Sequence, residues 1–99
     1  MMTPLRLMRK TDDPEEELAL QAKAGSHAAF EALYRMHLGH VYGICMRILT
    51  DQSRAEDVTQ KIFIQAWMKL QSFHGDSRFS SWLYRLSVNM ILDHLKPVG

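Results

Sequence analysis

The sequence predicts an all-α fold, a compact bundle of three long helices preceded by a short N-terminal helix. Apolar residues recur at steps of three and four along most of the chain, and no stretch alternates apolar and polar residues as a half-buried strand does. The composition is 46% hydrophobic, with only 5 Gly and 3 Pro, which favours helices over turn-rich β structure. A chain of 99 residues is long enough for one domain with one modest core.

The first helix is predicted from its start signals. The segment Asp12 to Glu17 offers a capping carboxylate, a proline in the first turn, and acidic residues where the helix dipole favours them. This helix is expected to run to Ala24, where a glycine ends it and Ser26 caps the next helix. Residues 1–11 have no periodicity and are expected to be a flexible tail, which leaves 12–96 as the folded domain.

The second and third helices are predicted from two apolar stripes. The second is expected from His27 to about Leu49, some six turns or roughly 33 Å of rise. Ser53 and Glu56 have the spacing of a capping box and predict the start of the third helix. That helix is expected to reach about Ser72, with a core stripe made of these residues: Val58, Ile62, Phe63, Ala66, Trp67 and Leu70.

A turn from Phe73 to Arg78 separates the third helix from a fourth. The fourth helix is expected from about Phe79 to Leu95, because Pro97 stops it. A glycine breaks the helical pattern in the turn, and the aspartate or serine that follows is expected to cap the fourth helix. Polar side chains recur at steps of three or four along the outer edge of that helix: Arg78, Ser81, Arg85, Asn89 and Lys96.

Charge is distributed unevenly along the chain. Residues 1–10 have a net charge of +3, residues 11–60 of −5 and residues 61–99 of +3, which sum to the overall +1. A basic C-terminal part suits a surface that faces DNA, and an acidic middle part suits a basic protein partner. Charge by itself does not choose between these functions.

The groups collected on the turn and the fourth helix suit an unpaired DNA strand. Lys and Arg neutralise phosphate, aromatic rings stack on exposed bases, and an amide such as that of Asn89 can pair with a base edge. A solvated helix face that carries two Arg residues is an ordinary alternative. The residue types alone leave both readings open.

Two long motifs carry a resemblance to a known family. They are AEDVTQKIFIQAW at residues 55–67 and SFHGDSRFSSWLYRLSVN at residues 72–89. From about Glu15 to Lys96, the chain resembles region two, the helical promoter-binding domain, of bacterial sigma-70 family factors, and in particular of the extracytoplasmic-function (ECF) group. The resemblance implies a transcription initiation domain that binds core RNA polymerase and melts the promoter minus-ten element. Full-length members continue into a second, region-four domain, so residues 97–99 are expected to begin a linker.

The resemblance implies that the turn and the fourth helix capture the non-template strand of the minus-ten element with one base flipped out. Asn89 matches the position that faces a promoter base, and Arg85 is expected to contact phosphate or base. Trp82 is expected either to stack on DNA or, as the favoured alternative, to support the turn from the rim of the core. The implied DNA-binding residues are Phe73, His74, Asp76, Ser77, Arg78, Phe79, Trp82, Arg85, Asn89 and Lys96.

The same resemblance implies that the third helix docks on the clamp helices of the largest polymerase subunit. Ile64 and Met68 are expected to be exposed there, which alone is equally consistent with scattered surface hydrophobes. Lys61 departs from the family pattern, which usually has Glu, and this alters the electrostatics of the contact. The implied polymerase-binding residues are Asp57, Gln60, Lys61, Ile64 and Met68.

Other function classes find little support in the sequence. It has no Gly-rich phosphate loop and no paired catalytic groups, so an enzyme, a cofactor site and a metal site are not expected. His37 and His40 share a helix face, but Cys45 is turned away from them, and a lone buried thiol fits a reducing cytoplasm. No apolar run is long enough for membrane insertion. An anti-sigma factor is an expected partner, and the competing reading is a helical protein-interaction module that binds polymerase or an anti-sigma factor without opening promoters.

Overall fold

The computed structural model describes residues 13–96, and every regular element in that range is helical. These elements are α2 (Pro14–Lys23), α3 (His27–Leu49), α4 (Gln52–Met68), the 3₁₀ turn η1 (Leu70–Ser72) and α5 (Phe79–Leu95). The predicted all-α bundle of three long helices and a short leading one is therefore confirmed. The expected tail at 1–11 and the expected linker start at 97–99 lie outside the described residues.

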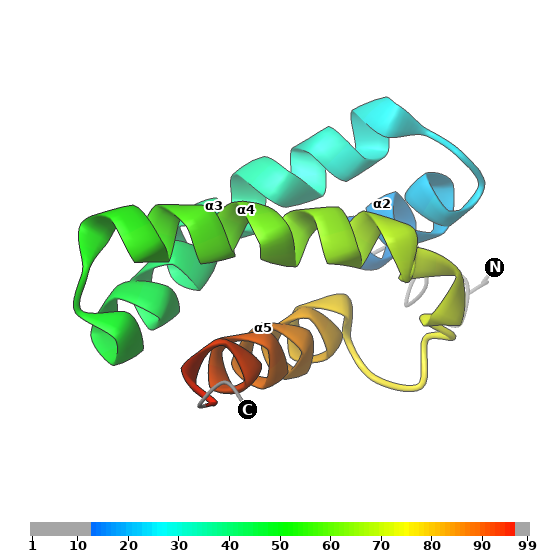
Figure 1. Cartoon of the computed structure of the whole chain (residues 1–99). Helices are drawn as coiled ribbons and strands as arrows, with labels where there is room; N and C mark the ends of the chain where they lie inside the picture. Colours follow the sequence, from blue (N-terminus) through cyan, green and yellow to red (C-terminus); the bar gives the residue numbers. More distant parts are fainter. Residues whose placement is uncertain (1–12, 97–99) are drawn as a thin grey trace, which may run out of the picture.

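The three long helices pack around one core, and α2 closes one end of it. Helices α3 and α4 run side by side in opposite directions, and α5 lies across both of them (Figure 1). Helix α2 packs on α3 and also contacts η1 and α5, so it lies beside the loop that leads into α5. The loop of residues 73–78, which we call the recognition loop, therefore runs over the end of the bundle that α2 covers.

The caps of α2 and α3 follow the sequence prediction, whereas those of α4 and α5 differ from it. Asp13 caps α2 by accepting hydrogen bonds from the backbone N–H groups of the residues two and three positions on, at 3.2 and 3.4 Å. Ser26 caps α3 by accepting from the Ala29 N–H at 3.0 Å. The expected capping box of Ser53 and Glu56 is wrong, because Asp51 is the cap of α4 and accepts from the Ser53 N–H at 3.0 Å. A carboxylate two residues earlier thus takes the place expected for the serine hydroxyl.

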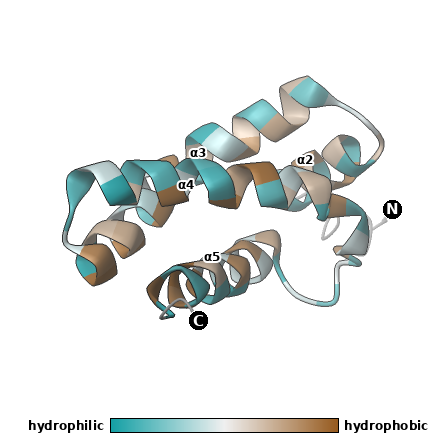
Figure 2. Ribbon diagram, viewed as in Figure 1, coloured by the Kyte–Doolittle hydropathy of each residue, from teal (hydrophilic) through white to brown (hydrophobic). Residues whose placement is uncertain are grey.

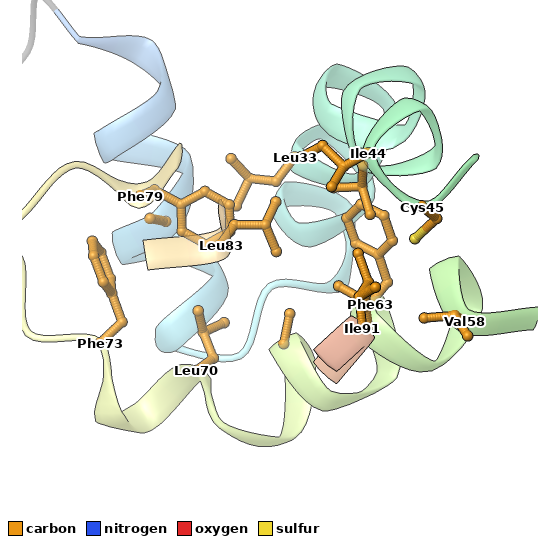
Figure 3. Close-up of a cluster of buried hydrophobic side chains, with 14 of the residues drawn as sticks. Leu33, Ile44, Cys45, Val58, Phe63, Leu70, Phe73, Phe79, Leu83 and Ile91 are labelled. Atoms are coloured by element: carbon orange, nitrogen blue, oxygen red, sulfur yellow. The ribbon is translucent and has the colours of Figure 1, made fainter. Parts of the chain in front are cut away.

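The core is continuous from the α3–α4 corner to the recognition loop (Figure 3). Leu33, Ile62, Leu83 and Ile91 from three helices are almost fully buried at its centre. Cys45 is also buried, as predicted, and burial raises the pKa of its thiol while the neighbouring Thr59 side chain opposes that rise. Among residues 13–96, no helix has both the length and the apolar character needed to cross a bilayer.

Candidate nucleic-acid interface

The recognition loop is anchored at both ends by aromatic side chains that face the core. The ring centroids of Phe73 and Phe79 are 5.7 Å apart and nearly perpendicular, and Trp82 lies 5.5 and 5.6 Å from them. Figure 3 shows both phenylalanines at the end of the core that α2 covers. Edge-to-face pairs of this kind add to the energy of burial. The two ends of the loop are thereby held close together.

The DNA contact expected of Phe73 and Phe79 stays a prediction, and the structure limits the part that their side chains can play in it. Their side chains are 3% and 1% exposed, so neither ring presents a face on which a base could stack. Burial of an aromatic ring stabilises the fold more than its exposure does. Both rings are buried and hold the ends of the loop in place. Trp82 is partly buried against them, a position that favours the alternative in which it supports the turn.

The middle of the recognition loop is exposed. His74, Gly75 and Asp76 all face solvent, and Gly75 adopts a φ of 82°, a left-handed conformation that glycine tolerates without strain. Ser77 is partly buried, and its hydroxyl accepts a hydrogen bond from the Arg85 guanidinium at 3.3 Å. This bond links the exposed loop to the outer surface of α5. The loop and the helix therefore form one continuous surface.

Three polar side chains extend that surface along α5. Ser81, Arg85 and Asn89 are exposed and follow one another at intervals of four residues, which places them on one side of the helix. The predicted exposure of Arg85 and Asn89 is confirmed. A groove of about 440 Å³ between α3 and α5 adjoins them, with these lining residues: His37, His40, Val41, Ser80, Ser81, Leu83, Tyr84 and Arg85. The surface offers a cation, an amide and hydroxyl groups next to a groove.

Two predicted DNA contacts occupy other places. Arg78 is directed toward α2, where its guanidinium lies 3.1 Å from Asp13 and 3.8 Å from Glu15. Lys96 follows the last turn of α5 and pairs with Asp93 at 3.3 Å. The helix from residue 79 to 95 rises about 24 Å, so Lys96 lies at the opposite end from the recognition loop. Lys96 is therefore far from the loop, and Arg78 is engaged with carboxylates near the start of α2.

The opposite flank of the recognition loop is acidic. A groove of about 570 Å³ lies between α2 and the loop, and it is lined by Asp13, Glu16, Glu17, Leu20, Phe73, His74 and Gly75. Asp13 pairs with Arg78 and Glu16 accepts the Phe79 N–H, so Glu17 is the carboxylate of this groove without a cationic partner among the described residues. It would repel phosphate groups, whereas Arg85 on the other side would attract them. A nucleic-acid strand that meets the loop would therefore approach from the α5 side.

The predicted partner surface on α4 is exposed and mixed in character, and Figure 2 shows hydrophilic and hydrophobic residues following one another along that helix. The expected exposure of Ile64 and Met68 is confirmed at 58% and 69%. Lys61 pairs with Asp57 at 3.1 Å, and both side chains are 58% exposed. A groove of about 430 Å³ adjoins this surface, with these lining residues: His27, Phe30, Tyr34, Gln60, Phe63, Ile64 and Trp67.

Sequence reasoning missed the contribution of α2 to this site. The Glu16 carboxylate accepts a hydrogen bond from the Phe79 N–H at 2.8 Å, across 63 positions of sequence. Asp76 or Ser77 was expected to cap α5, but Arg78 occupies the cap position, and its side chain makes no capping hydrogen bond. Acidic residues in the first turn of α2 had been explained by the dipole of α2 alone. Only the fold shows that one of them serves a different helix.

Comparisons with known proteins agree with this architecture. The profile of the family described as Sigma-70 region 2 matches residues 33–97. The chain is 34% identical over 76 residues to the ECF RNA polymerase sigma factor SigW of Bacillus subtilis. The matched region covers 77% of this chain and 41% of SigW. The chain therefore spans less than half the length of this relative.

Two solved structures have the same fold. The first is an engineered region 2 of sigmaE in complex with GTAAAA, with a TM-score of 0.76, 31% identity, and coverage of 82% of this chain and 84% of that one. The second is CnrH in complex with the cytosolic domain of CnrY, with a TM-score of 0.73, 31% identity, and coverage of 86% and 56%. The family profile, which covers most of the described residues, and the relative agree with one another. The chain belongs to the sigma-70 region 2 family.

Proposed function

We propose that this domain acts in transcription initiation by capturing the non-template strand of a promoter minus-ten element in single-stranded form. The recognition loop and the outer side of α5 would receive the strand. Arg85 would neutralise a phosphate, and Asn89 would pair with a base edge. The exposed loop at His74 to Ser77 would hold a base that has left the duplex, and this requires contacts that offset a few kcal/mol of unstacking.

One observation carries the proposal: Arg85 and Asn89 are both exposed on one side of α5, and Arg85 is bonded to the recognition loop through Ser77. The solved complex of a related region 2 with GTAAAA supports it, because that domain shares this fold and 31% of its sequence. The acidic groove beside α2 disfavours approach of a polyanion from that side, so the strand would reach the loop from the α5 side.

The direct test is fluorescence anisotropy with GTAAAA embedded in a longer labelled oligonucleotide, measured as a single strand and after annealing to its full complement. The single strand should bind more tightly than the duplex. Its affinity should fall as the salt concentration rises from about 50 to about 200 mM, because binding to phosphates releases counterions. Arg85→Ala should weaken binding. The matched control is Arg54→Ala, because Arg54 is also exposed but belongs to the start of α4. Equal binding of strand and duplex, or an equal effect of both substitutions, would argue against it.

We further propose that α4 docks on core RNA polymerase, at the clamp helices of the largest subunit. Ile64 and Met68 are large apolar side chains that remain exposed next to an apolar groove, and this combination is typical of a protein contact. Asp57 and Gln60 supply polar groups at the edge of that surface. Binding of this domain to a polymerase clamp fragment, and its loss in Ile64→Asp, would test the docking surface.

A second candidate function is a protein-interaction module that binds polymerase or an anti-sigma factor without opening DNA. The observation in its favour is that a related chain, CnrH, has been solved with the cytosolic domain of another protein, CnrY. The exposed apolar side chains of α4 would serve such a partner equally well. The two functions separate in one experiment, because a pure interaction module would bind the clamp fragment and leave the single-stranded oligonucleotide unbound.

A further inference from the structure

Helix α2 contacts the recognition loop at both of its ends. At the loop exit, the Glu16 carboxylate accepts the Phe79 N–H at 2.8 Å. At the loop entry, the Lys23 ammonium group donates to the Phe73 carbonyl oxygen at 2.5 Å. Both bonds are partly buried, and they join residues that are 63 and 50 positions apart in sequence. The two ends of one short helix thus hold the two ends of one loop.

The exit of the loop is held by charge as well as by this hydrogen bond. The first N–H groups of a helix are unpaired and carry partial positive charge, so a carboxylate at this place both satisfies a donor and stabilises the α5 dipole. Arg78, the residue before α5, pairs with Asp13 at 3.1 Å and with Glu15 at 3.8 Å. Carboxylate oxygens of Asp13, Glu15 and Glu16 all lie within 4.8 Å of one another. Arg78 and the α5 N-terminus offset their mutual repulsion, and a ring nitrogen of His37 contacts the Glu15 carboxylate.

The entry of the loop is held by a second pair of bonds. While Lys23 donates to the Phe73 carbonyl, the Gln71 side-chain amide donates to the Lys23 backbone carbonyl at 2.8 Å. The end of α2 and the chain that leads into the loop are therefore tied together in both directions. Glu16 and Lys23 are seven residues apart on α2, which places them on one side of that helix about 10 Å apart along its axis. That side faces the loop.

We infer that α2 is a splint for the recognition loop, that is, a helix that holds both ends of the loop in fixed positions. Glu16 and Lys23 are the positioning residues through which it supports DNA capture. This inference rests on the proposed function, because it assigns α2 a role in the same binding surface. Neither side chain touches the strand. Each fixes one end of the loop, so that the backbone between them keeps the conformation in which a base is received. A loop held in its binding conformation loses less entropy on binding and binds more tightly.

The experiment uses substitutions that separate positioning from charge. Glu16→Ala removes the acceptor for the Phe79 N–H, whereas Glu16→Gln keeps an acceptor oxygen while removing the same charge. Glu17→Ala is the control for charge, because Glu17 is an exposed neighbour that bonds only along α2 among the described residues. For the loop entry, Lys23→Ala is compared with Lys69→Ala, which removes an exposed lysine from the same region of the domain.

Two readouts are taken on the 99-residue chain. The first is the affinity for the single-stranded GTAAAA oligonucleotide, with binding to the polymerase clamp fragment as a check that the bundle is intact. The second is amide hydrogen exchange without DNA, read at Phe73 and Phe79, whose N–H groups are hydrogen-bonded at the entry and exit of the loop. Glu16→Ala and Lys23→Ala should each weaken DNA binding about tenfold, in line with the loss of a bond to a charged group. Both should speed exchange in the loop and leave clamp binding unchanged.

The conservative and control variants decide the interpretation. Glu16→Gln should bind DNA within about twofold of the original chain, because its amide oxygen still accepts the Phe79 N–H. Glu17→Ala and Lys69→Ala should leave loop exchange unchanged. The inference is overturned if the original chain binds DNA while Glu16→Ala and Lys23→Ala bind equally well with unaltered loop exchange. If the original chain itself fails to bind DNA, the proposed function fails, and faster loop exchange in the two variants would still establish the splint.

Discussion

The Arg85 guanidinium donates a hydrogen bond to the Ser77 hydroxyl, with 3.3 Å between Nη2 and Oγ, and this contact joins α5 to the recognition loop. The bond is exposed and joins neutral and charged partners, so a nearby phosphate can compete for the same guanidinium. Arg85 is thereby held over the loop, and no carboxylate pairs with it among the described residues. Arg78, in contrast, lies close to two carboxylates at the start of α2. This difference makes Arg85 the cation available to a bound strand.

Replacement of Arg85 by Ala should weaken binding of single-stranded DNA and reduce its dependence on salt. Each phosphate neutralised on a single strand contributes about −0.7 to the slope of log K against log salt concentration. Loss of one contact should therefore make the slope less steep by about 0.7. Titrations of the oligonucleotide at several salt concentrations measure it. An unchanged slope would mean that Arg85 does not contact a phosphate, even if affinity falls.

Replacement of Asn89 by Ala should change base preference more than it changes the salt slope. A hydrogen-bonded base contact discriminates against wrong bases by about 1–3 kcal/mol, whereas an amide releases no counterion. A panel of oligonucleotides altered at single positions of GTAAAA measures the preference. The expected result is a position whose discrimination disappears in the variant. As a control, Gln52→Ala removes an exposed amide at the start of α4 and should leave the preferences intact.

Replacement of Ile64 by Asp should abolish docking of α4 on the polymerase clamp while sparing DNA binding. A charge placed in a contact that excludes water costs several kcal/mol, so affinity should fall by roughly a hundredfold or more. Met36→Asp provides the comparison, because Met36 is 52% exposed on α3 and lies outside the proposed surface. Pull-down with a clamp fragment measures both. Similar losses in the two variants would point to general destabilisation instead.

The Asp57 and Lys61 pair allows a finer test of the same surface. The two side chains are both 58% exposed, so their ion pair contributes about 0–1 kcal/mol to folding and either can be exchanged without loss of structure. If α4 docks on a basic clamp surface, Asp57→Ala should weaken the complex, and Lys61→Glu should preserve or strengthen it. Indifference of the complex to both substitutions would place the docking surface elsewhere.

Replacement of Phe79 by Ala should destabilise the fold by about 3–5 kcal/mol, as expected for a buried aromatic residue. Its side chain is 1% exposed and packs against Phe73, Trp82 and His37. Urea unfolding followed by circular dichroism measures the change. Tyr84→Ala, at a ring that is 50% exposed, should cost far less. A small effect at Phe79 would contradict its place in the core and reopen its role as a DNA contact.

The stability of the domain should fall in alkaline solution because of Cys45. Burial raises the pKa of this thiol above its ordinary value of 9.0, so the unfolded chain releases the proton at a lower pH than the folded protein does. The contribution is complete below pH 9.0 and is lost as pH rises through the folded pKa, by up to about 1.4 kcal/mol per pH unit. The free energy of unfolding of Cys45→Ala, measured alongside, should lack this part of the decline. Parallel curves would contradict the assignment.

The helices could be predicted from the sequence because their signals are local. The bounds of α3 and α5 match the expectations, and Ser26 and Pro97 account for the start of the first and the end of the second. The third helix, expected to reach about Ser72, ends at Met68 and is followed by the 3₁₀ turn η1. The exposure of Asn89 followed equally from helical spacing.

The support of the recognition loop could not be predicted, because its partners are distant in sequence. Glu16 and Phe79 are 63 positions apart, and nothing near either residue indicates that one caps the other's helix. Phe73 and Phe79 were assigned to DNA because aromatic residues beside an exposed turn suit both a core and a stacking platform. Only the packing of α2 against α5 shows that the core takes both rings.

The most direct test of the account is an NMR titration of the ¹⁵N-labelled chain with single-stranded GTAAAA. Amide shifts should concentrate on residues 74–78 and on the side of α5 that carries Ser81, Arg85 and Asn89, while the shifts of α4 residues such as Ile64 should stay unchanged. Shifts centred on α4, or spread evenly over exposed lysines and arginines, would contradict a binding surface built from the recognition loop and α5.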